Sequence, residues 1–229
     1  MSHKSEDIIS PLSIDCVLFG FEQAELKVLL IRRAIDPKFD HWALPGGFIL
    51  YAESVENASK RILAEMTGVQ DLFLEQLKAF GRVDRYPGKR VVTIAYYALI
   101  KPGNYQLNPG SDASEAAWFP ISKIQNLPFD HKEILNTALD TLRRKVRHQP
   151  IGFELLPGKF TLLQLQELYE AIFDIKLDKP NFRRKFKRMN LLVELDERQK
   201  DVAHRAARLY RFDKERYDRL YEGGFVFEV

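Results

Sequence analysis

Cysteine is almost absent from this sequence, in which Cys16 is the single example among 229 residues. One thiol cannot form a disulfide within the chain, and it excludes a zinc site built from cysteines. Long apolar runs are also missing, because no stretch approaches the roughly 18 residues that a membrane-spanning helix needs. The first dozen residues mix both signs of charge and have no apolar core, which argues against a signal peptide. We therefore expect a cytoplasmic protein that does not associate with a membrane.

A strong overall charge is missing as well, and a net charge of +3 does not by itself argue for a nucleic-acid partner. The basic residues are instead concentrated in one segment. Between positions 179 and 211 there are eleven lysines and arginines but four acidic residues, so the remainder of the chain is net acidic. A local basic excess of this kind is typical of a segment that binds the phosphates of DNA.

The first two thirds of the chain combine strand and helix patterns, which predicts an α/β fold. Apolar, β-branched runs predict strands at 13–19, 27–33, 74–83, 91–100 and 117–120, with a hairpin connection at 20–25. Helical periodicity predicts a helix at 55–66 that ends at Gly68, and a second at 130–147 that opens with Asp130 and Glu133 in capping-box spacing. Prolines and a glycine follow at 150–157, so we predict a first domain at 1–148 and a second at 149–229.

The second domain has the order helix, helix, hairpin. Thr161 and Gln164 have capping-box spacing at the start of a helix, and Pro180 opens another that ends near Met189. Strands at 191–195 and 207–212 follow around a basic loop. This is the order of a winged helix-turn-helix domain, whose second helix reads the major groove. The candidate DNA contacts are Asn181, Arg183, Arg184, Lys185, Lys187, Arg188 and Arg205. A basic helix that faces only solvent, or one that pairs with a protein, is the alternative.

One segment of the first domain carries a known pattern. Residues 47–69, GFILYAESVENASKRILAEMTGV, resemble the Nudix box, G-x5-E-x7-R-E-U-x-E-E-x-G-U, in which U is apolar. The matching residues are Gly47, Glu53, Arg61, Leu63, Glu65, Gly68 and Val69. The resemblance covers roughly residues 10 to 145 and implies a Nudix α/β/α sandwich.

Two departures from the box bear on its chemistry. Ile62 and Met66 stand where Nudix hydrolases have glutamates that hold Mg²⁺, and neither side chain offers the oxygen ligand that Mg²⁺ requires. We therefore expect no catalytic residue, no metal and no cofactor. The spacing of Arg61 and Glu65 favours an internal tether over a catalytic site. The alternative is an active Mg²⁺-dependent hydrolase of ADP-ribose or a related nucleoside diphosphate, which would use Glu53, Glu56 and Glu65.

A cleft that has lost its metal ligands can still bind a small molecule. Charged residues gather at strand ends and in the loop DRYPGKR, where they would hold phosphates or sugar hydroxyls. The candidate ligand contacts are Arg32, Glu65, Arg82, Asp84, Arg85 and Arg90. For each residue taken singly, the alternative is a solvated surface charge.

The two domains together, with the junction IGFELLP and the helix NFRRKF, resemble the Nudix-related transcriptional regulators over nearly the whole chain. The resemblance implies a homodimer that binds an operator in duplex DNA and responds to a small-molecule effector bound by the Nudix domain. Some members resemble ADP-ribose-sensing regulators of NAD metabolism, and others resemble arabinose-sensing regulators. We lean towards the second branch, with an L-arabinose-type sugar as effector.

Overall fold

The computed structural model describes residues 12–110, 112–200 and 206–229. Its described residues form two compact units: one comprises the chain up to Gly20 together with Lys27–Leu139, and the other comprises Phe21–Leu26 with Asp140–Val229. Within these described ranges, no helix has both the length and the apolar character needed to cross a bilayer. The domain boundary after residue 148 stays a prediction, because one helix contributes residues to both units.

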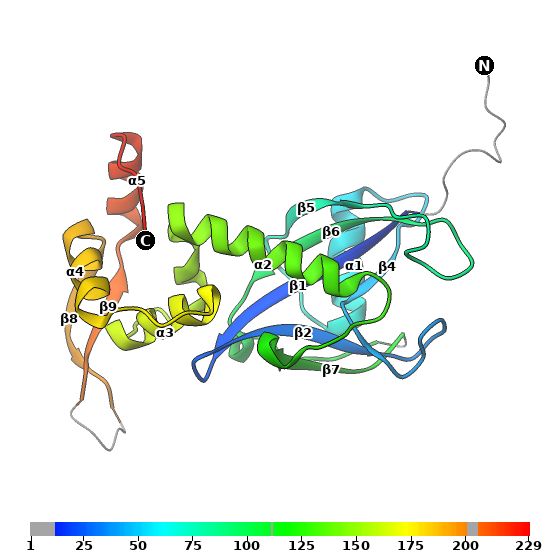
Figure 1. Cartoon of the computed structure of the whole chain (residues 1–229), viewed down its shortest axis with the longest axis horizontal. Helices are drawn as coiled ribbons and strands as arrows, with labels where there is room; N and C mark the ends of the chain where they lie inside the picture. The colour runs from blue at the N-terminus through cyan, green and yellow to red at the C-terminus, as the bar shows by residue number, and fades with distance from the viewer. Residues whose placement is uncertain (1–11, 111, 201–205) are drawn as a thin grey trace. The chain divides into compact units, whose positions relative to one another are not determined.

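The first unit is built around a mixed sheet that contains seven strands in the described residues (Figure 1). The strands are β1 (Leu12–Glu22), β2 (Glu25–Arg33), β3 (Trp42–Ala43), β4 (Gly46–Phe48), β5 (Glu75–Phe80), β6 (Val92–Leu99) and β7 (Ala113–Pro120). Their order is β3-β2-β1-β6-β5, with β1 and β6 parallel, while β4 and β7 pair antiparallel with β1 and β2. The hairpin between β1 and β2 is tighter than expected, because Gln23 and Ala24 both adopt the positive φ of a two-residue turn.

Helices α1 (Val55–Thr67) and α2 (His131–His148) cover opposite faces of this sheet. Alternation along β1 sends Ile14 and Cys16 to one face, where they form a buried core with Ile62 and Met66 of α1. Asp15, which lies between them, points to the other face, where β1 meets the start of α2. Figure 1 shows both helices against the sheet. The predicted α/β/α sandwich is confirmed.

The second unit has the predicted order of helix, helix and hairpin. It contains α3 (Leu162–Phe173), α4 (Lys179–Met189), β8 (Leu192–Arg198), β9 (Arg208–Phe212) and α5 (Lys214–Glu222), of which α5 was not expected. A short 3₁₀ turn at Pro150–Leu155 precedes α3, and two others, Pro102–Asn104 and Ile121–Lys123, belong to the first unit. The capping box of α3 is formed, since Thr161 accepts the Gln164 N–H and Gln164 accepts the Thr161 N–H. The core joins Tyr169 of α3 to Phe182 and Phe186 of α4.

Candidate functional site

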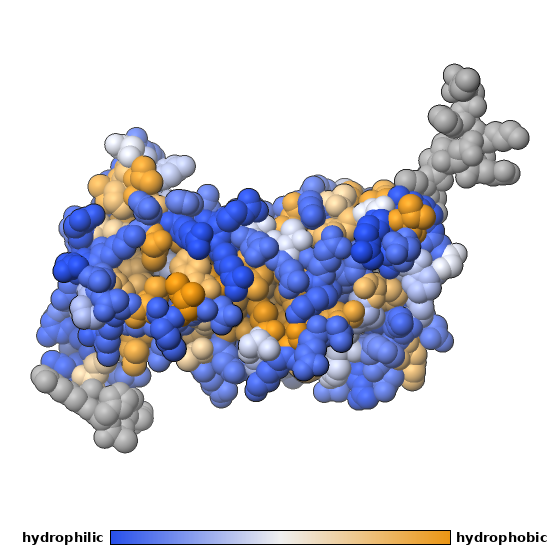
Figure 2. All heavy atoms as spheres, viewed as in Figure 1, coloured by the Kyte–Doolittle hydropathy of each residue, from blue (hydrophilic) through white to orange (hydrophobic). Residues whose placement is uncertain are grey.

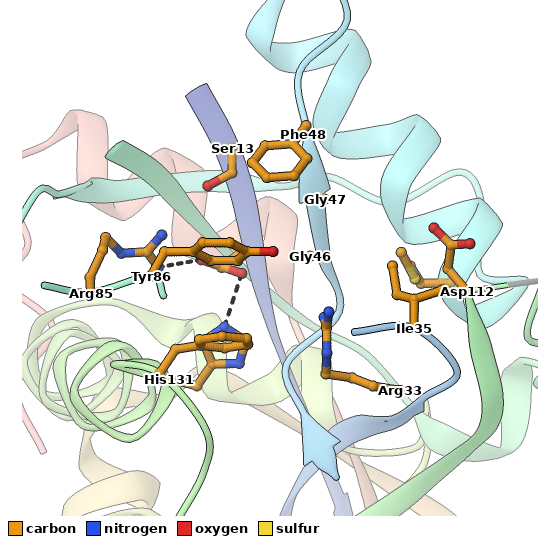
Figure 3. A pocket seen from close by; sticks show the side chains of 13 residues that line it. Ser13, Arg33, Ile35, Gly46, Gly47, Phe48, Arg85, Tyr86, Asp112 and His131 are labelled. Atoms are coloured by element: carbon orange, nitrogen blue, oxygen red, sulfur yellow. Dashed lines mark hydrogen bonds and ion pairs between the residues drawn. The ribbon is translucent and has the colours of Figure 1, made fainter. Parts of the chain in front are cut away.

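A cavity of about 120 Å³ opens in the first unit, beside β1, β2 and the start of α2. Figure 3 shows Arg33 reaching into it from β2, while Tyr86 and His131 come from other elements. Its lining residues are Ser13, Asp15, Arg33, Ile35, Gly46, Gly47, Phe48, Met66, Arg85, Tyr86, Asp112, Phe129 and His131. The cavity therefore combines aromatic rings with charges of both signs, as expected of a site for a polar small molecule.

One wall of the cavity is a buried charge network centred on Arg85. Its Nε and Nη2 donate to the two carboxylate oxygens of Asp130 at 2.8 and 2.7 Å, and Nη2 also donates to Asp15 at 3.0 Å. Burial alone would lower the pKa of Arg85, but the two carboxylates raise it above its usual value. Arg85 is thus paired within the protein. Asp130 is paired as well, since both of its carboxylate oxygens accept hydrogen bonds from Arg85.

His131 completes this wall and has a defined tautomer. Its Nδ1 accepts the Leu44 N–H at 3.0 Å, so the ring proton lies on Nε2, which is 3.3 Å from Asp15 Oδ1. Burial raises the pKa of Asp15, but His131 and Arg85 outweigh this effect and the pKa lies below its usual value. Gly46 packs so closely here that a Cβ would lie 2.2 Å from Asp15 Oδ1, which leaves no room for a side chain.

Another part of the cavity lining presents a cation over an aromatic stack, whose Phe129 ring lies 5.2 Å from that of His131. Nε of Arg33 donates to the Pro37 carbonyl at 3.0 Å, and the guanidinium lies 5.4 Å from the centre of the Phe129 ring. Phe129 stacks in turn on Tyr86, with 5.2 Å between centroids and 11° between planes. Burial lowers the pKa of Arg33, and Tyr86 and the carboxylates of Asp15, Asp112 and Asp36 act in the opposite direction.

Arg33 was missed by the sequence analysis, which chose its neighbour Arg32. Successive side chains of a strand point to opposite faces, so the two arginines differ completely in surroundings. Arg32 is 40% exposed and pairs with Asp40 at 2.8 Å and with Glu115 at 3.8 Å. The alternation was visible in the run KVLLIRR, but it did not show which face carries the cavity.

The other candidate ligand contacts lie outside the cavity lining. Arg82 and Asp84 are exposed and face each other at 3.5 Å, and Arg90 donates to the Arg82 carbonyl at 3.1 Å. Glu65 is exposed and pairs with Arg61 at 2.8 Å. Of this set the structure brings Arg85 to the cavity. Ligand contacts by the others stay a prediction.

Arg61 forms the tether that its spacing predicted. Its Nε donates to Glu53 at 2.8 Å, Nη1 to Glu65 at 2.8 Å and Nη2 to the Phe48 carbonyl at 3.0 Å. The hydrogen bond from Arg61 lowers the pKa of Glu53 to about 2. Both Glu53 oxygens accept hydrogen bonds from Arg61. Ile62, the residue after Arg61 in the Nudix box, is buried.

The box in this arrangement does not fit a Mg²⁺ site. Magnesium needs several oxygen ligands in near-octahedral geometry, whereas the carboxylates of Glu53 and Glu65 are bound to one arginine. Within the described ranges, no three His, Cys, Asp or Glu side chains are grouped so that they could hold a metal ion.

Helix α4 separates an apolar face from a basic one. Phe182 and Phe186 are buried, and Figure 2 shows hydrophilic side chains over the outer surface of this helix. Its candidate DNA contacts are exposed, except for the half-buried Arg183: Asn181, Arg184, Lys185, Lys187 and Arg188. Arg184 donates to the side-chain oxygen of Asn181. The last candidate, Arg205, lies outside the described residues.

Comparison with known proteins agrees with this two-part architecture. The family model of the NUDIX domain matches residues 10–140, and that of the NrtR DNA-binding winged helix domain matches residues 152–212. The chain is 35% identical over 220 residues to the ADPR responsive transcriptional repressor NtrR of Acinetobacter baylyi, which covers 94% of this chain and 88% of that protein.

Similar solved structures include two of Shewanella oneidensis NrtR. Shewanella oneidensis NrtR complexed with a 27mer DNA has a TM-score of 0.70 and 30% identity, over 88% of this chain and 93% of that chain. The NUDIX domain of the same protein complexed with ADP ribose has a TM-score of 0.55 and 33% identity, over 61% of this chain and 94% of that chain. The protein therefore belongs to the NrtR family of transcriptional regulators, in which a NUDIX domain is joined to a DNA-binding winged helix domain.

Proposed function

We propose that this protein is a transcriptional repressor of NAD metabolism genes that responds to ADP-ribose, and that its Nudix domain binds this effector without cleaving it. The observation that carries the proposal is the identity with the Acinetobacter repressor over both domains. The relatives favour ADP-ribose over the L-arabinose-type sugar towards which the sequence analysis leaned, because the Nudix domain of the Shewanella protein is complexed with ADP ribose.

The charges in the cavity support an anionic effector. Arg33 is buried in the cavity wall with an aromatic ring beneath it. A diphosphate would accept bidentate, charge-assisted hydrogen bonds from its guanidinium, which a neutral pentose would not. The rings of Tyr86 and Phe129 offer flat surfaces to the planar or apolar parts of a nucleotide.

The surroundings of the box support binding without hydrolysis. Metal-assisted cleavage of a diphosphate needs carboxylates that are free to hold the ion. Here Arg61 engages Glu53 and Glu65, and the neighbouring positions on α1 are filled by the buried Ile62 and Met66. The domain keeps the shape of a nucleotide-binding fold without an arrangement of ligands for the ion.

The exposed basic face of α4 supports recognition of DNA in the major groove. Asn181 and Arg184 lie near its N-terminal end, where residues of a recognition helix reach base edges. In this proposal the protein acts as a homodimer, so that two such helices meet two operator half-sites one helical turn apart. Effector binding changes the population of the arrangement that fits both half-sites.

The test is a DNA-binding titration with the full chain. An operator is first selected from a pool of random duplexes, and its affinity is then measured by fluorescence anisotropy with ADP-ribose, AMP or L-arabinose present. We expect ADP-ribose to weaken binding by about 5- to 150-fold, L-arabinose to have no effect, and ADP-ribose to be recovered intact. An effect of L-arabinose alone, or turnover of ADP-ribose at ordinary enzymatic rates, would contradict the proposal.

Charge reversal tests the DNA-binding face. Arg184→Glu with Lys187→Glu should abolish operator binding, because these side chains are exposed on α4. The matched control, Lys60→Glu with Lys123→Glu, makes the same change of net charge on the exposed surface of the first unit and should retain binding. The wild-type affinity should fall steeply with salt, as phosphate contacts require. Equal operator affinity in the two double variants would show that α4 is not the recognition helix.

A further inference from the structure

The segment that follows α5 turns back and buries an aromatic side chain. Gly224 has a φ of +86°, a backbone conformation that favours glycine, and the Phe225 N–H donates to the Leu220 carbonyl at 2.9 Å. The chain thereby reverses along α5 (Figure 1). Two residues later Phe227 is 1% exposed, while its neighbour Val226 is 73% exposed. The segment is thus anchored through one side chain.

Phe227 is buried against the rear of the recognition helix. Its ring centroid lies 6.4 Å from that of Phe186, the fully buried residue at the centre of α4, and 6.4 Å from that of Tyr217 in α5. The ring planes cross at 66° and 86°, respectively, in the edge-to-face arrangement that aromatic rings favour. Phe186 points inward from the helix whose outer face carries the basic residues, so contact with its ring bears on the position of that outer face.

The same segment also binds the end of α2. The Val229 N–H donates to the Arg147 carbonyl at 3.0 Å. The last four carbonyls of a helix have no partner within the helix, so this bond satisfies one of them. The last turns of α2 are further held by Arg143, whose Nε donates to the Ile172 carbonyl at 2.8 Å. At its other end α2 begins with His131, which lines the cavity.

We infer that residues 225–229 form a positioning element for the recognition helix, in which Phe227 holds the rear of α4 while Val229 holds the end of α2. The segment lies beyond the residues matched by the NUDIX and winged helix families, which end at 140 and 212. Contacts with base edges require placement of the reading side chains to within about 0.5 Å, so a recognition helix depends on what supports it from behind. For its effect on regulation this inference rests on the proposed function.

The test compares Phe227→Ala and the milder Phe227→Leu with the control Val226→Ala, all in the full chain. Hydrogen exchange measured without ligand should rise about tenfold or more for α4 amides in Phe227→Ala, and less in Phe227→Leu, while α1 is unchanged. Operator affinity with and without ADP-ribose gives the second measurement. The ratio of the two affinities should fall towards 1 in Phe227→Ala, although its affinity for ADP-ribose stays that of the wild type. Val226→Ala should match the wild type throughout.

Three results would overturn the inference. In the first, α4 exchange is unchanged in both Phe227 variants. In the second, exchange rises equally in α3, α4 and β8, which would make Phe227 an ordinary core residue. In the third, both variants keep the wild-type ratio of affinities. If Phe227→Ala does not fold, Phe227→Leu decides by the same criteria. If the operator affinity of the wild type does not change with ADP-ribose, the proposed function is contradicted instead. Hydrogen exchange of α4 would still decide whether Phe227 positions that helix.

Discussion

Two adjacent arginines allow a matched test of the cavity. Arg33→Met and Arg32→Met remove the same charge from neighbouring positions of β2 and retain a long apolar side chain at each. Arg33 is buried in the cavity wall, whereas Arg32 is 40% exposed and already paired with Asp40. If the effector is anionic and is held by the cavity, the two variants must differ sharply in their affinity for ADP-ribose.

The size of the difference follows from the contacts involved. A hydrogen bond to a charged group contributes about 1.5–3 kcal/mol, so loss of two such bonds from Arg33 costs at least about 3 kcal/mol, or roughly 100-fold in Kd. Loss of Arg32 removes an exposed ion pair that contributes about 0–1 kcal/mol to folding and nothing to the ligand. We expect the Tm of Arg33→Met to stay close to that of the wild type, because loss of the hydrogen bond to the Pro37 carbonyl is offset by relief of the cost of burying a charge.

Isothermal titration calorimetry with ADP-ribose, together with thermal unfolding of each variant, provides the measurements. Weaker binding in Arg33→Met, with wild-type binding in Arg32→Met, supports the assignment. Equal affinities in the two variants would refute the reasoning. A large fall in the Tm of Arg33→Met would also refute it, because Arg33 would then be a structural residue.

Other predictions concern buried polar groups. Arg85→Met leaves Asp15 and Asp130 buried without their cation, so the free energy of unfolding in a denaturant titration should fall by about 3–5 kcal/mol; a loss below about 1 kcal/mol would contradict the network. The pKa of Asp15 is lowered by folding, so its contribution to stability is complete above its unfolded pKa of about 4 and is lost as the pH falls below that value. Between pH 7 and pH 3 the wild type should therefore lose more stability than Asp15→Asn. The hydroxyl of Tyr169 is buried and finds no hydrogen-bond partner among the described residues, so Tyr169→Phe should leave the Tm unchanged or raise it; a clear fall would reveal a partner.

Features encoded within a few residues of one another were predictable from the sequence. The capping box at Thr161 and Gln164 and the end of α1 at Gly68 depend on backbone groups three or four positions away, and both are formed. The tether between Arg61 and Glu65 follows in the same way from one turn of helix. Local spacing was enough to place these elements and, with the Nudix pattern, to identify the architecture.

Features that depend on distant residues were not predictable in this way. Asp130 had the spacing of a helix cap, yet its carboxylate pairs with Arg85, 45 positions earlier in the chain. Arg32 and Arg33 are the same residue type in the same strand, and they differ in that the cavity lies on the side of Arg33. Phe227 lies in a segment without a clear periodic pattern, and its burial depends on a ring in α4. In each case the deciding partner is supplied by tertiary packing.

If the domain binds its effector without cleaving it, as proposed, the packing of α1 opposes the introduction of a metal site. Ile62 is 1% exposed, so a glutamate at this position would carry its charge into the hydrophobic interior, whereas Met66, 6% exposed, also lines the cavity. Burying an ionised carboxylate without a partner costs several kcal/mol, a large part of the stability of an ordinary domain. Placing two acids at these positions would therefore also require rebuilding the side chains around α1.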